Sequence, residues 1–283
     1  MISTFLRLIK FSHTIFALPF ALLGYFIGVR HFGFDYVILL QVIVAMIFAR
    51  SAAMGFNRIV DREWDAKNSR TAGREIPSGQ ISTKTVAIIV AVCSCLFVLT
   101  ALSINMLCFL LSPVALVVIL GYSYTKRFTS WAHVALGVAL SISPMGAYIA
   151  VGGTLVWEVV LLAGVVAMWV AGFDIIFALQ DEEFDRAEGL HSMPAKLGTR
   201  GALWVSGVCH ILSGVMVVAL GFMLDVGAVI YFSGAAIFIA ILCYEHIVVT
   251  PSKRDRVGFA FATLNSMASV FYCLFSIASL YFS

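Results

Sequence analysis

The chain has 283 residues, of which 61% are hydrophobic and only 12% are charged, and its net charge is +3. Soluble domains carry about a quarter of their residues as charged side chains. This shortage of charge and a mean hydropathy of +1.02 exclude a soluble globular domain and indicate a polytopic membrane protein. The small positive net charge does not require a nucleic acid partner.

Apolar runs separated by short polar breaks predict about nine transmembrane helices. They cover residues 12–30, 36–57, 85–103, 106–124, 132–151, 156–179, 202–221, 226–246 and 258–280. The runs are continuously apolar and about twice as long as a tilted membrane strand, so we expect an all-α fold. The first run has no small-residue cleavage site after it and is interpreted as a retained helix.

Basic residues gather on one side of this arrangement. Of the 18 lysines and arginines, 16 lie at the N-terminus or in segments 58–84, 126–127, 186–200 and 253–256. These segments follow every second helix, and basic loops stay on the cytoplasmic side. We therefore expect an N-terminus inside, a C-terminus outside and, in a bacterium, insertion in the inner membrane.

An acidic motif occupies residues 57–65, at the end of the second predicted helix. Asn57, Asp61 and Asp65 are spaced by four residues, which puts their oxygen-bearing side chains on one helical face. Two carboxylates stacked in this way repel each other, and the edge of a membrane bundle adds a desolvation cost. A bound cation would relieve both.

A second acidic motif occupies residues 174–185. Asp174, Asp181 and Asp185 are spaced by seven and four residues and are expected to form one stripe. The pattern D-x-E-aromatic-D starts at Asp61 and recurs 120 residues later at Asp181. This offset predicts a pseudo-repeat of four-helix units that places both motifs at one central cavity.

The two motifs predict a magnesium site. Magnesium prefers oxygen ligands, binds one or two carboxylates and accepts phosphate oxygens as further ligands. Basic side chains in the adjoining loops would bind a diphosphate directly. They are Arg70, Arg74, Lys126, Arg127 and Lys196. A diphosphate on a lipid tail suits the membrane setting.

N-x-x-x-D-x-x-x-D at 57–65 followed by D-x-x-x-D at 181–185 resembles the UbiA family of intramembrane prenyltransferases. Four further segments carry the resemblance: "HTIFALPFA" (13–21), "GREIPSG" (73–79), "SYTKRFT" (123–129) and "DIIFALQDEEFD" (174–185). The branch that prenylates 4-hydroxybenzoate or a related aromatic acid for quinone synthesis looks the most similar. The resemblance implies a single prenyltransferase domain over residues 1–283.

The resemblance also implies an activity and a ligand set. A polyprenyl group would pass from a polyprenyl diphosphate to an aromatic acid, for ubiquinone or menaquinone synthesis. The implied magnesium ligands are Asn57, Asp61, Asp65, Asp181 and Asp185. A dihydroxynaphthoate, haem or a chlorophyll precursor is an alternative acceptor, and protein partners are left open.

Two other classes of membrane protein fit the sequence less well. A membrane ion or metabolite transporter would carry its acids near the midplane on broken helices, whereas these motifs lie at helix ends beside basic loops. A phosphatidyl-alcohol transferase would need a D-G-x-x-A-R opening that this chain lacks.

The roles of two side chains stay open at this point. Asp174 is either a general base or ring-hydroxyl partner, or a residue that orients an arginine or a water. Arg50 lies seven residues before Asn57, on the same face and within the membrane, where a charge is costly and is usually functional. It either binds the carboxylate of the acceptor or pairs with Asp174.

Other polar residues near the motifs receive structural interpretations. Glu182 and Glu183 point away from the aspartate stripe, so we expect both on a solvated face. Three histidines are expected in polar packing rather than as ligands: His13, His133 and His191.

Overall fold

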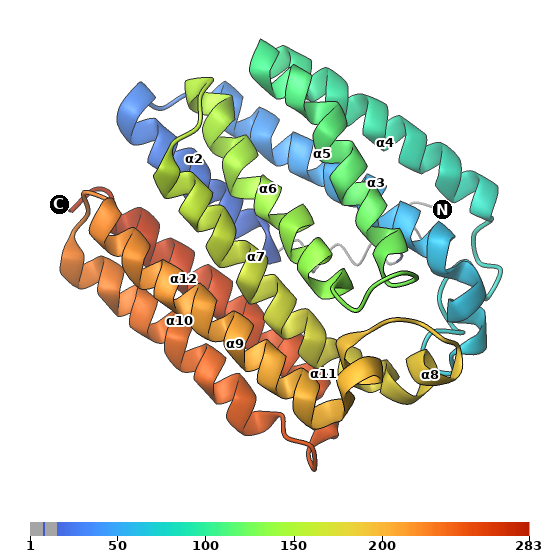
Figure 1. Cartoon of the computed structure of the whole chain (residues 1–283). Coiled ribbons are helices and arrows are strands. Elements are labelled where there is room, and N and C mark those ends of the chain that lie inside the picture. The colour runs from blue at the N-terminus through green and yellow to red at the C-terminus, as the bar shows by residue number, and fades with distance from the viewer. Residues whose placement is uncertain (1–7, 9–15, 283) are drawn as a thin grey trace.

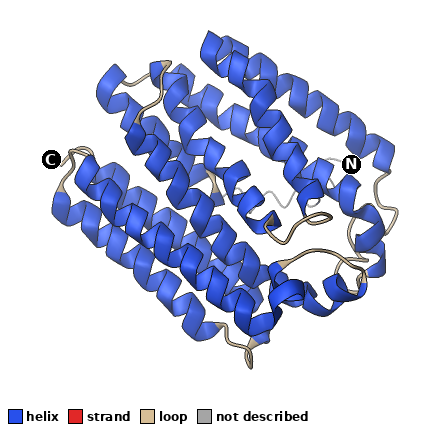
Figure 2. Ribbon diagram, viewed as in Figure 1, coloured by secondary structure: helices blue, strands red, loops and turns tan. Residues whose placement is uncertain are grey.

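A computed structural model describes Leu8 and residues 16–282, and the regular structure in that part of the chain is helical (Figure 2). The long helices are α2 (Leu18–Phe32), α3 (Tyr36–Lys67), α4 (Thr83–Ile104), α5 (Met106–Thr125), α6 (Ala132–Gly152), α7 (Trp157–Ala178), α9 (Met193–Met223), α10 (Ala228–Val248) and α12 (Asn265–Ser279). The short elements are the 3₁₀ helix η2 (Leu179–Asp181), α8 (Glu182–Ala187), the 3₁₀ helix η3 (Arg254–Arg256), α11 (Val257–Phe259) and the π-helix η4 (Ala260–Leu264).

The predicted all-helical membrane fold is confirmed. Within the described residues, eight helical segments are long and apolar enough to cross a membrane, and α2, with 15 residues, is a shorter apolar ninth. The first predicted helix would begin at residues 12–15, which lie outside the described part of the chain.

Two predicted helix ends need correction. The α3 helix does not end at 57 but continues to Lys67, because Arg, Glu and Lys at its end are good helix formers although they end the apolar run. The α9 helix begins at Met193 rather than 202 and bends at Gly198, whose φ of 68° lies in the left-handed region that glycine tolerates. Hydropathy locates the membrane part of a helix and not its full length.

The helices form a bundle with α2, α6 and α7 in the middle, α3, α4 and α5 on one side, and α9, α10 and α12 on the other (Figure 1). Two glycines allow the middle helices to approach closely. A Cβ atom at Gly24 of α2 would overlap the Pro144 carbonyl of α6, and one at Gly137 would overlap the Ala167 carbonyl of α7. Membrane helices commonly pack through such small residues. Here Gly24 allows close packing of α2 on α6, and Gly137 allows close packing of α6 on α7.

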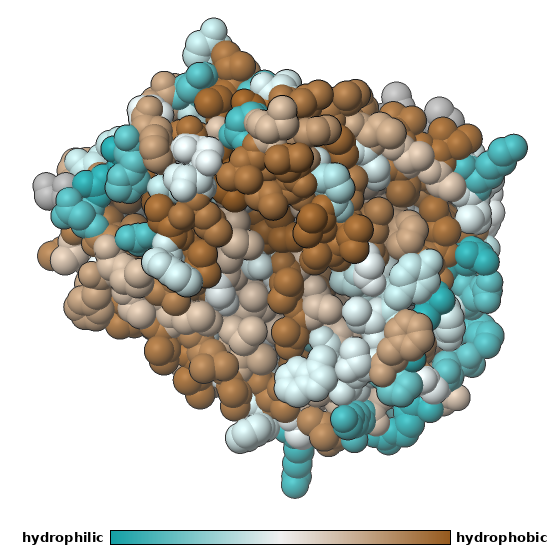
Figure 3. All heavy atoms as spheres, turned by 45° about the horizontal axis from the view of Figure 1, so that its top comes forward, coloured by the Kyte–Doolittle hydropathy of each residue, from teal (hydrophilic) through white to brown (hydrophobic). Residues whose placement is uncertain are grey.

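The outer surface is apolar where the bundle meets lipid. Brown hydrophobic side chains cover much of the face in Figure 3, and teal hydrophilic side chains gather toward its edges. Large exposed side chains such as Val117, Ile211 and Phe222 belong to α5 and α9. A soluble protein would bury them, whereas a bilayer solvates them.

The last transmembrane segment contains a π-helical turn at Ala260–Leu264. The backbone N–H of Asn265 bonds to the Ala260 carbonyl, five residues back, and its side-chain Nδ2 donates to the same oxygen at 3.1 Å. That amide also donates to Glu245 Oε1 at 3.0 Å and accepts a hydrogen bond from Trp169 Nε1 at 2.9 Å. The buried side chain of Asn265 thus ties the turn to α10 and α7.

Candidate active site

A cavity of about 720 Å³ lies mainly among α3, α5, α6 and α7. The six polar residues of the two motifs all line it: Asn57, Asp61, Asp65, Asp174, Asp181 and Asp185. Its wall also includes apolar residues as distant as Leu155, just before the far end of α7, so the space runs along the helix. A cavity with a polar end and a long apolar part suits an amphiphilic ligand that has an anionic headgroup.

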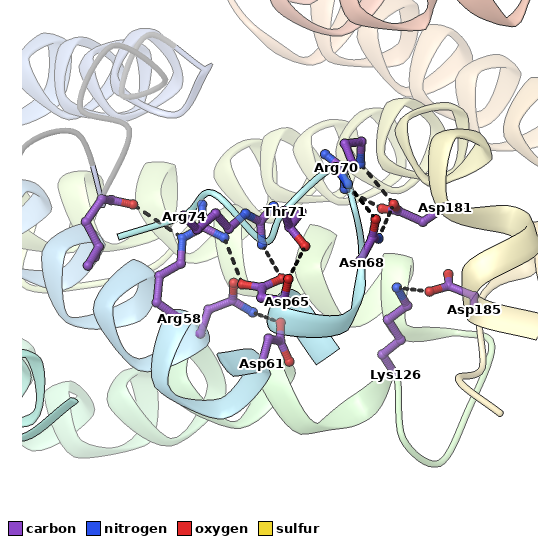
Figure 4. A network of polar contacts seen from close by, with 12 residues as sticks. Arg58, Asp61, Asp65, Asn68, Arg70, Thr71, Arg74, Lys126, Asp181 and Asp185 are labelled. Atoms are coloured by element: carbon purple, nitrogen blue, oxygen red, sulfur yellow. Dashed lines mark hydrogen bonds and ion pairs between the residues drawn. The ribbon is translucent and has the colours of Figure 1, made fainter. Parts of the chain in front are cut away.

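The first motif lies on the last turns of the unbroken helix α3 (Figure 4). Asn57 Nδ2 donates to Asp61 Oδ2 at 2.9 Å, and Asp65 Oδ1 accepts from Arg74 Nη1 at 2.6 Å. Asp65 Oδ2 is buried and has no hydrogen-bond partner among the described residues, and the guanidinium of Arg58 is 4.0 Å away. A buried carboxylate oxygen in this condition is costly and is ready to accept a cation.

The second motif does not form one helical stripe, which corrects the expectation from its spacing. Asp174 lies on α7, which ends at Ala178; Asp181 lies in η2, and Asp185 lies on the short helix α8. The change from α to 3₁₀ geometry turns the chain between the aspartates. All three carboxylates nevertheless reach the same cavity.

The loop after α3 ties the two motifs together. Asn68 Nδ2 donates to Asp181 Oδ1 at 2.8 Å, Arg70 Nε donates to the same oxygen at 2.9 Å, and Arg70 Nη2 bonds to Asp181 Oδ2 (Figure 4). The sequence motifs do not include Asn68. Its position three residues after Asp65, on the same side of the chain, is the signal that would have identified it.

The other predicted phosphate ligands have different surroundings. Lys126 Nζ lies 2.6 Å from Asp185 Oδ1. Arg127 Nη2 donates to the Val60 carbonyl at 2.8 Å, and its guanidinium lies over the rings of Trp64 and Tyr124. Lys196 is exposed and does not line the cavity.

Arg50 and Asp174 lie apart from the motif ion pairs. Arg50 lines the cavity from α3, and its buried Nε has no hydrogen-bond partner among the described residues. Asp174 Oδ2 lies 2.7 Å from Nδ1 of the buried His133. His133 Nε2 accepts the Met193 backbone N–H at 3.3 Å, so Nδ1 of the neutral ring carries the proton and donates to Asp174. In the described structure Asp174 therefore pairs with His133 and not with Arg50.

The other two histidines differ from His133. His191 is exposed, and its backbone N–H donates to the Lys126 carbonyl at 2.8 Å. His13 lies outside the described residues. The buried position of His133 agrees with the polar packing expected from the sequence, although its partner is a cavity carboxylate.

The prediction of a solvated Glu182 is wrong. Its side chain is only 8% exposed; Thr199 Oγ1 donates to Oε2 at 2.6 Å, and Arg254 Nη2 lies 3.0 Å from the same oxygen. Because α8 starts a new turn at Glu182, this side chain points inward against α9 and not along the direction that one continuous helix would give. Glu183 is exposed, as predicted.

An intramembrane helical bundle with two opposed acidic motifs at the polar end of a lipid-sized cavity defines a class of membrane enzyme. The model of the UbiA prenyltransferase family matches residues 17–270 of this chain. The chain therefore belongs to the UbiA prenyltransferase family.

Individual relatives and solved structures agree with this assignment. The chain is 29% identical over 250 residues to a 4-hydroxybenzoate octaprenyltransferase from Aliivibrio fischeri strain MJ11, covering 87% of this chain and 85% of the relative. It is 30% identical over 231 residues to the enzyme of the same name from Aeromonas salmonicida, covering 80% and 78%.

Two solved structures have the same fold. One is the apo structure of a UbiA homologue from Aeropyrum pernix K1, with a TM-score of 0.81, 28% identity and coverage of 95% of this chain and 97% of the other. The other is a UbiA homologue from Archaeoglobus fulgidus bound to DMAPP and Mg²⁺, with a TM-score of 0.72, 19% identity and coverage of 98% and 99%.

Proposed function

We propose that residues 1–283 form a single domain that transfers a polyprenyl group from a polyprenyl diphosphate to the ring of an aromatic acid. 4-Hydroxybenzoate is the proposed acceptor, which would place the reaction in ubiquinone synthesis at a bacterial inner membrane. The names of the relatives support this acceptor. The observation that carries the proposal is that both acidic motifs and their basic partners meet at one end of a long apolar cavity.

The site fits Mg²⁺ as the cofactor. Oxygen atoms are its preferred ligands, and the buried Asp65 Oδ2 accepts no hydrogen bond from the part of the chain that the structure describes. No cluster of three His, Cys, Asp or Glu side chains forms a ready-made metal site within the described residues. A shared site suits Mg²⁺, which takes few carboxylates and completes its shell with phosphate and water.

The proposed ligands are the motif residues Asn57, Asp61, Asp65, Asp181 and Asp185. When bound there, Mg²⁺ would neutralise the charge that develops on the departing diphosphate.

The protein's basic side chains would hold the diphosphate. Arg70, Arg74 and Lys126 each pair with a motif carboxylate in the present structure. Their N–H groups are therefore already fixed around the polar end and stabilise negative charge with little reorganisation. Exchange of a carboxylate partner for a phosphate oxygen retains a charge-assisted hydrogen bond.

The reaction breaks a C–O bond and a ring C–H bond and forms one C–C bond. The bond between C1 of the prenyl group and oxygen breaks, and its electron pair leaves with the diphosphate. A ring carbon ortho to the acceptor's hydroxyl then bonds to C1, and the proton on that carbon must leave. Asp174, which His133 holds at 2.7 Å, is the proposed acceptor of this proton. The apolar wall excludes the water that would otherwise trap the allylic cation.

Arg50 is the proposed partner of the acceptor's carboxylate. It lies on α3 two turns before Asn57, and its buried Nε lacks a partner among the described residues. A guanidinium binds a carboxylate through two parallel hydrogen bonds, which would also orient the ring.

The proposed orientation puts the motif loops on the cytoplasmic side. Single cysteines at the exposed positions Ser69 and Lys196, in a chain without its native cysteines, should react with a membrane-impermeant maleimide only from the cytoplasmic side. Reaction from the opposite side would contradict this orientation.

Product analysis tests the proposed function directly. Purified protein in lipid, given geranyl diphosphate, Mg²⁺ and either 4-hydroxybenzoate or a dihydroxynaphthoate, should yield the prenylated hydroxybenzoate by mass spectrometry. Product from the naphthoate alone would assign the chain to menaquinone synthesis. Absence of product from both acids would contradict the proposal.

A further inference from the structure

Four phenylalanines form one wall of the cavity beside its acidic end. Phe16, Phe173, Phe177 and Phe261, here called the aromatic wall, all line the cavity. The ring centroids of Phe177 and Phe261 are 4.2 Å apart, and those of Phe173 and Phe261 are 5.5 Å apart. The ring centroid of Phe16 lies 5.7 Å from that of Phe173 and 5.3 Å from that of Phe261.

The aromatic wall lies next to the proposed diphosphate site. Phe177 is on α7, between Asp174 and Asp181 in the chain. The guanidinium of Arg70, which pairs with Asp181, lies 5.4 Å from the centroid of the Phe177 ring. C1 of a prenyl diphosphate is bonded to a diphosphate oxygen, so the first carbons of the chain would lie close to this ring.

The π-helical turn positions Phe261. It is the second residue of η4, and the bonds from Asn265 to Ala260, Glu245 and Trp169 hold the turn. A π-helical turn contains one residue more than an α-helical turn and so changes the direction of the side chains on it. Burial of the polar groups of Asn265, Glu245 and Trp169 in a membrane bundle is costly. Here these groups maintain the irregular turn that carries Phe261 on the cavity wall.

The side chains that line the cavity from α3 include charged groups of both signs. Arg50 and Arg58 lie there together with the proposed Mg²⁺ ligands Asp61 and Asp65. The arginines would repel a developing carbocation and the two carboxylates are assigned to the metal, whereas the faces of aromatic rings attract cations. The aromatic wall is therefore suited to stabilise a cation within this lining.

We propose that Phe261 and Phe177 are catalytic residues that stabilise the allylic cation through their ring faces. The inference rests on the proposed prenyl transfer and adds a site for the cationic fragment. As the C1–O bond breaks, the electron pair leaves with the diphosphate toward the basic side chains, and the positive charge is left beside the rings. The rings form no covalent bond and exchange no proton.

Fluorination of the ring tests this role, because each fluorine weakens the negative potential of the ring face and leaves its shape nearly unchanged. Phenylalanine, 4-fluoro-, 3,5-difluoro- and 3,4,5-trifluorophenylalanine would be introduced at position 261 by amber suppression. Single-turnover rates with geranyl diphosphate, Mg²⁺ and 4-hydroxybenzoate should fall stepwise along the series. A fall of about tenfold corresponds to roughly 1.4 kcal/mol of cation–π attraction. The KM for geranyl diphosphate should not change.

Phe238 is the matched control. It is fully buried on α10 among Trp169 and Tyr272 but does not line the cavity. The same series at Phe238 should leave the rate unchanged. A flat series at Phe261, or a series that changes only KM, would overturn the inference while product formation by the wild type still supports the proposed function. Failure of the wild type to form product would instead remove the proposed function itself.

Discussion

The two acidic motifs share the pattern D-x-E-aromatic-D but are built differently. The first lies on one unbroken helix, α3, while the second passes from a 3₁₀ turn into the short helix α8. The second position of each motif shows the difference most clearly. Arg62 of the first is exposed, whereas Glu182 of the second is buried against Thr199 and Arg254.

This difference shows that a repeated sequence pattern need not give a repeated local structure. Flanking contacts decide it: the α3 motif is continuous with a long helix, whereas α8 is six residues long and depends on tertiary contacts for its position. Glu182 provides such contacts to α9 and to η3. The first motif thus has its geometry from its own helix, and the second from its neighbours.

The largest effect is expected from substitution of the motif aspartates that line the cavity. The exposed glutamates of the same motifs serve as the comparison. Asp61→Ala and Asp185→Ala should each lower kcat by at least about a hundredfold, because charge stabilisation at the departing diphosphate is lost. Glu63→Ala and Glu183→Ala, exposed positions in the same motifs, should stay near the wild-type rate. Product formation by mass spectrometry measures all four. Near-normal activity in either aspartate variant would refute the assignment.

A smaller effect, on the free energy of unfolding, is expected from substitutions at the second position of each motif, and it should differ between the two motifs. Glu182→Gln removes the buried carboxylate that pairs with Arg254 and should destabilise the fold by about 1 to 2 kcal/mol, less than for a fully buried pair because the Arg254 side chain is 40% exposed to solvent. The equivalent Arg62→Gln should change stability by no more than about 0.5 kcal/mol. Thermal unfolding in detergent measures both. Equal changes would show that the second motif does not depend on this contact.

The most selective effect is expected at Arg50, because its substitution should change the binding of one substrate only. Arg50→Lys should weaken binding of the aromatic acid and raise its KM by about tenfold to a hundredfold, since loss of a charge-assisted interaction costs roughly 1.5 to 3 kcal/mol. The KM for geranyl diphosphate should stay the same. Lys196→Met, at an exposed position outside the cavity, is the control. A rise of both constants in Arg50→Lys would indicate that this side chain supports the bundle instead.

Much of the fold follows from local chemistry that a sequence displays. Long apolar runs require helices in lipid, and this predicted the all-helical bundle. Asn57, Asp61 and Asp65 could be placed on one face because the helix continues through them. The same reasoning failed for Asp174, Asp181 and Asp185, because spacing does not reveal where an α-helix changes to a 3₁₀ turn.

Contacts between distant segments could not be predicted from spacing. The burial of Glu182 depends on Arg254, 72 residues later in the chain, and on the direction in which α8 starts. The bond from His133 to Asp174 joins α6 to α7 and depends on their close packing at Gly137. The π-helical turn before Asn265 has no composition signal of its own, since its stability comes from Glu245 and Trp169.

The central claim is that the two motifs form one Mg²⁺-dependent diphosphate site, and a double-mutant cycle tests it most directly. Isothermal titration would measure the Kd of geranyl diphosphate with Mg²⁺ for the wild type, Asp61→Asn, Asp181→Asn and the double variant. If the motifs bind the same ligand together, each single change should weaken binding, and the double change should cost less than the sum, with a coupling of about 0.5 to 3 kcal/mol. Additive losses, or wild-type affinity in either single variant, would contradict the claim.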